Sequence, residues 1–192
     1  MDYTSQSEEE KIARSKKMML WFGIVGLSMM FAGLTSAYIV SKERRDWLSD
    51  FQLPEAFYIS TGIIVLSSIT MILAKKAIIA EQQRNGQLLL GLTFILGAVF
   101  VYLQFLGFDQ IIAEGYFFTG SESNVTTSFI YAFVLTHVAH IGVGIIVLLV
   151  MLIKQFNGSY ANGNTLGVSL GATFWHFVDI LWVYLFLFLL YF

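Results

Sequence analysis

One carboxylate, Asp179, stands inside an otherwise apolar stretch, in the octapeptide WHFVDILW that runs from Trp175 to Trp182. A charged group at the centre of a bilayer costs about 2.5–3.5 kcal/mol on insertion scales, so it is retained where it is paired or useful. His176 precedes Asp179 by three residues and Trp175 precedes Trp182 by seven, so each pair shares one face of a helix. These residue types and spacings make the octapeptide the first candidate for a functional site.

A second polar pair, His137 and His140, occurs in the preceding apolar stretch. Their i,i+3 spacing places both imidazoles on one face of a helix. Together with His176 and Asp179, they form two polar patches on consecutive apolar segments.

Several kinds of chemistry fit these patches. Imidazoles and a carboxylate suit zinc or non-haem iron, although neither His-Glu-x-x-His nor Glu-x-x-His occurs. Haem b would need His137 or His140 opposite His176 as axial ligands. Buried carboxylates and histidines also build proton relays in transporters. The interpretation that the residues alone favour is structural: such groups satisfy one another, backbone carbonyls or lipid headgroups, and hold helices together.

The composition is that of an integral membrane protein. Of the 192 residues 57% are hydrophobic and 12% are charged, whereas a soluble domain carries about 25% charged residues. The absence of cysteine excludes disulfides, thiolate metal sites and covalent haem attachment. The net charge of −2, with basic residues scattered among the connections, does not indicate nucleic-acid binding.

Five apolar runs approach the roughly 20 residues that a helix needs to cross a bilayer. They predict a single all-α membrane domain, residues 1–192, built as a five-helix bundle with spans at about 18–40, 57–74, 88–108, 129–153 and 168–191. Expected connections include the segments 75–87, 109–128 and 154–167. Lys and Arg concentrate on one side, eight against three, which predicts that the N-terminus lies inside and the C-terminus outside.

With these residues in view, the chain resembles subunit III of the haem–copper terminal oxidases, the cytochrome c oxidase and quinol oxidase family. Trp175 to Asp179 followed by Trp182 is similar to the signature of the family's last helix, and the resemblance covers nearly all of the chain. Three further stretches resemble the family: His137-x-x-His140-x-Gly142-x-Gly144, Gln104 with Gly107 before Thr127-Ser128-Phe129, and Phe31-Ala32-Gly33-Leu34 to Ala37-Tyr38.

The resemblance implies a non-catalytic protein. Members have no haem, copper or other redox centre of their own, so no catalytic and no metal-ligating residue is expected here. They pack against the catalytic subunit I beside a proton-uptake entrance, and they hold phospholipids in a cleft between helices. The residues then expected to be structural or lipid-proximal are His137, His140, His176, Asp179, Trp175, Trp182, Lys154 and Gln104.

Two positions depart from the family pattern. The family often has Ser-Glu in the helix that matches the first span, and this chain has Ser28-Met29. Where mitochondrial-type members carry a His-His pair and a Glu before the last helix, this chain has Asn164-Thr165 and Ser169. These departures weaken a proton-linked role in the first span and a lipid-headgroup site before the last one.

The resemblance therefore implies subunit III of an aa3-type cytochrome c oxidase in the aerobic respiratory chain of a bacterial inner membrane. Its expected role is to stabilise the catalytic subunit and its proton uptake and to bind phospholipid. The alternatives are subunit III of a quinol oxidase, a haem-b membrane anchor and a small proton-coupled transporter.

Overall fold

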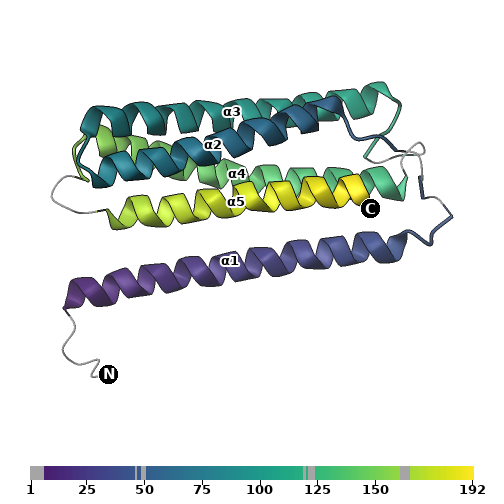
Figure 1. The fold of residues 1–192 in the computed structure, drawn as a ribbon. Helices are drawn as coiled ribbons and strands as arrows, with labels where there is room; N and C mark the ends of the chain where they lie inside the picture. Colours follow the sequence, from purple (N-terminus) through teal and green to yellow (C-terminus); the bar gives the residue numbers. More distant parts are fainter. Residues whose placement is uncertain (1–6, 46, 49–50, 119, 121–123, 161–164) are drawn as a thin grey trace.

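The fold is an all-helical bundle, seen in a computed structural model that describes residues 7–45, 47–48, 51–118, 120, 124–160 and 165–192. The described part holds five α-helices, each long and apolar enough to cross a membrane. They are α1 (Glu8–Ser41), α2 (Glu55–Ile79), α3 (Gln83–Ala113), α4 (Val125–Phe156) and α5 (Leu166–Tyr191). The start of α1 and the end of α5 lie at opposite ends of the bundle (Figure 1).

The predicted five-span all-α architecture is confirmed, because each apolar run falls within one helix. The predicted extent of the connections was wrong. The segment 75–87 is helical except at residues 80–82, and 109–128 is helical up to Ala113 and again from Val125. Hydropathy finds only the residues that suit hydrocarbon, whereas a helix continues into water until its backbone is capped or turned.

The first helix shows how a span is lengthened in this way. Ser7 caps α1, and its Oγ accepts a hydrogen bond from the backbone N–H of Glu10 at 3.3 Å. Three acidic residues, Glu8 to Glu10, occupy the first turn, where the positive end of the helix dipole stabilises them. These signals start α1 ten residues before the predicted span at Met18.

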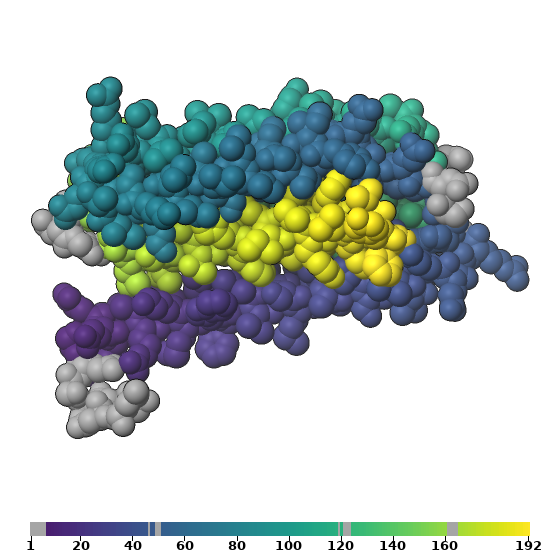
Figure 2. All heavy atoms as spheres, in the orientation of Figure 1, coloured from purple at the N-terminus to yellow at the C-terminus, as the bar shows by residue number. Residues whose placement is uncertain are grey.

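Helices α2 to α5 form one packed group, and α1 lies beside α5 as a separate layer (Figures 1 and 2). The main core of the group draws buried residues from all four helices, among them Ile64, Leu90, Ile141 and Trp175. A smaller cluster joins α1 to α4 and α5 through Phe31, Tyr38, Phe133, Leu181, Leu185 and Phe188. Large apolar side chains such as Phe22 and Ile180 are exposed on the outside, as lipid contact requires.

Candidate functional site

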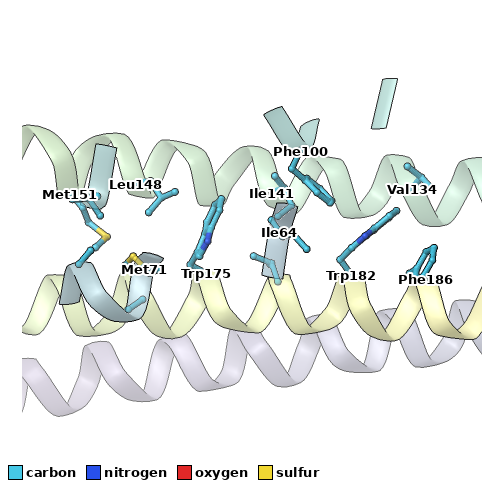
Figure 3. Packing of buried hydrophobic residues seen from close by; sticks show 14 of the residues in the cluster. Ile64, Met71, Phe100, Val134, Ile141, Leu148, Met151, Trp175, Trp182 and Phe186 are labelled. Atoms are coloured by element: carbon cyan, nitrogen blue, oxygen red, sulfur yellow. The ribbon is translucent and has the colours of Figure 1, made fainter. Parts of the chain in front are cut away.

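The octapeptide Trp175 to Trp182 lies in the middle of α5, and its two tryptophans point into the bundle toward α4 (Figure 3). Trp175 is buried, and its Nε1–H donates a hydrogen bond to Ser67 Oγ of α2 at 3.1 Å. A Cβ atom at Gly97 of α3 would lie 2.7 Å from Trp175 Cη2, and one at Gly144 of α4 would lie 3.0 Å from Cε3. The indole therefore touches three helices and fits because two of them present glycine.

Trp182, two turns further along α5, repeats the arrangement. Its Nε1–H donates to Thr61 Oγ1 of α2 at 3.0 Å. Its ring lies 5.3 Å from Phe100 and 5.2 Å from His137, measured between ring centroids. An indole that buries its apolar body and satisfies its N–H on a neighbouring helix is a packing element.

The two ionisable residues between the tryptophans both lie toward Ser68 of α2. His176 Nδ1 lies 2.7 Å from Ser68 Oγ, within hydrogen-bond distance. Asp179 is only 3% exposed and also lies beside Ser68, but neither carboxylate oxygen makes a hydrogen bond of good geometry within the described part of the chain. The pair thus shares a neighbour on α2 and forms no direct bond between its own members.

The histidines of α4 have different environments despite their spacing. His137 is fully buried, and neither ring nitrogen has a hydrogen-bond partner among the described residues. His140 is half-buried, and its Nδ1 lies 2.6 Å from the carbonyl oxygen of Thr136. Because a carbonyl oxygen only accepts, Nδ1 is the donor in this hydrogen bond. Phe31 of α1 packs edge-on against both rings.

The other two predicted residues lie on α3 and α4, and neither hydrogen-bonds to the octapeptide within the described chain. Gln104 of α3 is buried, and its Nε2 donates to Ser60 Oγ of α2 at 2.9 Å. Lys154 is exposed in the last turn of α4, where a cation is favoured by the helix dipole. The structure therefore bonds Trp175, Trp182, His176 and Gln104 to hydroxyls of α2, places Asp179 beside Ser68, and leaves Lys154 apart.

The sequence interpretation missed the hydroxyl residues of α2 that receive these side chains. Ser60 and Ser67 are seven residues apart, and so are Thr61 and Ser68. Hydroxyls that recur every two turns in an apolar run were the available signal, because this spacing places them on one face of a helix. Within the described ranges, no three His, Asp or Glu side chains are grouped closely enough to hold one metal ion.

Five membrane helices held together by buried indoles and hydroxyls define an all-helical, multi-pass membrane protein. The family model described as cytochrome c oxidase subunit III matches residues 46–192. The chain therefore belongs to the subunit III family of the haem–copper terminal oxidases, as a subunit of a multi-subunit oxidase complex in a bacterial plasma membrane.

Similar proteins are named either as cytochrome c oxidase subunits or as ubiquinol oxidase subunits. Cytochrome c oxidase subunit 3 of Bacillus sp. (strain PS3) is 28% identical over 90% of this chain and 84% of the relative. Cytochrome bo(3) ubiquinol oxidase subunit 3 of Buchnera aphidicola is 28% identical over 96% and 91%. The subunit of the same name from Pseudomonas aeruginosa is 36% identical over 71% and 63%. The family thus includes subunits of oxidases that use cytochrome c and of oxidases that use ubiquinol.

Proposed function

We propose that the chain is a non-catalytic subunit III that stabilises the catalytic subunit of an aa3-type cytochrome c oxidase and its proton uptake. The main observation behind this proposal is that the octapeptide packs α5 against α2. Trp175, Trp182 and His176 all bond to hydroxyls of α2, so they hold α5 in the bundle. Polar bonds of this kind provide cohesion between membrane helices, where no hydrophobic drive acts between them.

Cytochrome c as the donor is supported by the description of the matching family and by the Bacillus relative. The quinol oxidase alternative is supported by the relatives from Buchnera and Pseudomonas. The two electron donors are distinguished by measuring the oxygen consumption of the purified complex with reduced cytochrome c and with a quinol. Turnover with quinol alone would contradict the cytochrome c assignment.

We also propose that the chain binds no haem, copper or other redox centre of its own. A bis-histidine haem b would need His137 or His140 to face His176. Instead, the rings of Phe31, Phe100 and Trp182 surround His137, and Ser68 engages His176. A visible spectrum of the chain separated from the catalytic subunit tests this: we expect no Soret band, and a retained band would support the haem-b anchor.

Affinity purification of the tagged chain in mild detergent tests the assembly role itself. We expect a haem-containing catalytic subunit to co-purify with it. A chain that purifies without any haem–copper subunit would contradict the proposal. The same preparation, analysed for lipid, tests the expectation that phospholipid remains bound.

A further inference from the structure

The hairpin of α2 and α3 carries a groove at each of its ends. The first, the Lys76 groove, has a volume of about 540 Å³ and is lined by Leu73, Lys76, Ala77, Ala80, Gln82, Asn85, Leu88 and Leu89. The second, the Glu55 groove, has a volume of about 350 Å³ and is lined by Glu55, Ala56, Ile59, Leu103, Leu106, Asp109, Gln110 and Ala113. Both grooves are open to the surface of the described chain.

The Lys76 groove combines an ammonium and amides with an apolar wall. Lys76 lies in the last turn of α2, and Gln82 and Asn85 lie at the start of α3. Asn85 Nδ2 donates to Gln82 Oε1 at 2.9 Å, which leaves the Gln82 amide nitrogen and a second Asn85 N–H available as donors. Leu73, Leu88 and Leu89 continue the lining with apolar side chains.

This order of groups follows the order of groups in a phospholipid. The ends of the helices are the level at which headgroups meet a membrane protein, and the adjoining turns face acyl chains. An ammonium and amide donors suit a phosphate, and leucine side chains suit a hydrocarbon chain. A soluble phosphate would use only the polar end, so the apolar wall favours a lipid.

The two grooves differ in the sign of their charge. The Lys76 groove is lined by one cation, Lys76, and by no carboxylate. The Glu55 groove is lined by two carboxylates and no cation. An anionic headgroup is therefore attracted at the first groove and repelled at the second.

We propose that the Lys76 groove is a specific binding site for an anionic phospholipid. The phosphate lies against Lys76 and the amides of Gln82 and Asn85, and an acyl chain follows the leucines. The inference rests on the expectation, given with the proposed function, that phospholipid remains bound to the subunit, and it is independent of the electron donor.

Native mass spectrometry of the purified oxidase complex, delipidated and then titrated with phosphatidylglycerol or phosphatidylcholine, tests the site. We expect a phosphatidylglycerol adduct on this subunit that Lys76→Gln weakens about fivefold, since a lysine near a headgroup contributes about 1 kcal/mol. Lys76→Arg should restore binding. Lys75→Gln is the matched control, because Lys75 lies toward His176 of α5 and outside the groove lining. Equal losses in the two glutamine variants, or no preference for phosphatidylglycerol over phosphatidylcholine, would overturn the proposal.

Photocrosslinking locates the lipid independently. A phosphatidylglycerol with a photoreactive acyl chain should label peptides within 73–89 of the wild-type complex and label them less in Lys76→Gln. Labelling confined to other helices would overturn the assignment. Because every variant is first checked for co-purification with the catalytic subunit, failure of the lipid site is distinguishable from failure of the proposed function.

Discussion

The Nε1–H of Trp175 on α5 donates to the hydroxyl of Ser67 on α2 over 3.1 Å, while the indole fills the space between α3 and α4. One side chain thus sets the position of α5 relative to three other helices. The bond also explains why tryptophan is needed here, since a phenylalanine would fill much of the space but make no hydrogen bond to α2.

Alanine at Gly97 should destabilise the bundle by about 1–3 kcal/mol, because an added Cβ overpacks the core. That atom would lie 2.7 Å from Trp175 Cη2, so the indole or α3 must move. Gly91→Ala, on the same helix but with open space around it, is the control and should be neutral or slightly stabilising, because alanine has the higher helix propensity. Thermal unfolding of the purified complex measures both variants, and equal unfolding temperatures would contradict the close contact.

The hydrogen bond between Trp182 and Thr61 should show a measurable coupling free energy. A double-mutant cycle with Trp182→Phe and Thr61→Val is expected to give about 0.6 kcal/mol, the average for such bonds between membrane helices. Thr173→Val replaces Thr61→Val in the control cycle, because the Thr173 hydroxyl bonds within α5 to Ser169. Coupling of similar size in the control cycle would show that the bond to Thr61 is not its source.

Replacing Asp179 by Asn should weaken co-purification with the catalytic subunit or shorten the active lifetime of the oxidase during turnover. The carboxylate lies beside Ser68, which also holds His176, so the change perturbs the contact between α5 and α2. Asp109→Asn, at an exposed position, is the control. An unaltered complex with an unaltered turnover lifetime would count against a structural role, and loss of a transport activity would favour the transporter alternative.

The orientation in the membrane is testable because the chain has no cysteine. Single cysteines at Glu114, which caps the end of α3, and at Ser159, which follows the end of α4, report the two sides, and both positions are exposed. With the N-terminus inside, a membrane-impermeant maleimide should label Glu114→Cys and not Ser159→Cys in right-side-out spheroplasts. Labelling of Ser159→Cys and not of Glu114→Cys would show that the N-terminus lies outside.

The sequence alone was sufficient for the class of protein and the number of helices. Apolar runs of about 20 residues are recognisable without any tertiary contact, because hydrocarbon rejects polar side chains wherever they occur along a span. The octapeptide also pointed to the family. The boundaries were less predictable, as at Ser7, because capping acts beyond the apolar run that hydropathy detects.

Only the tertiary structure decided which polar residues meet. Helical periodicity placed His137 and His140 on one face, yet one is enclosed by aromatic rings and the other bonds to its own helix. Likewise, the spacing of residues along α5 could not identify Ser67 of α2 as the hydrogen-bond partner of Trp175. Periodicity determines which face a side chain occupies, but its partner depends on how closely two helices approach. That approach is set by the small residues of other helices, here Gly97 and Gly144.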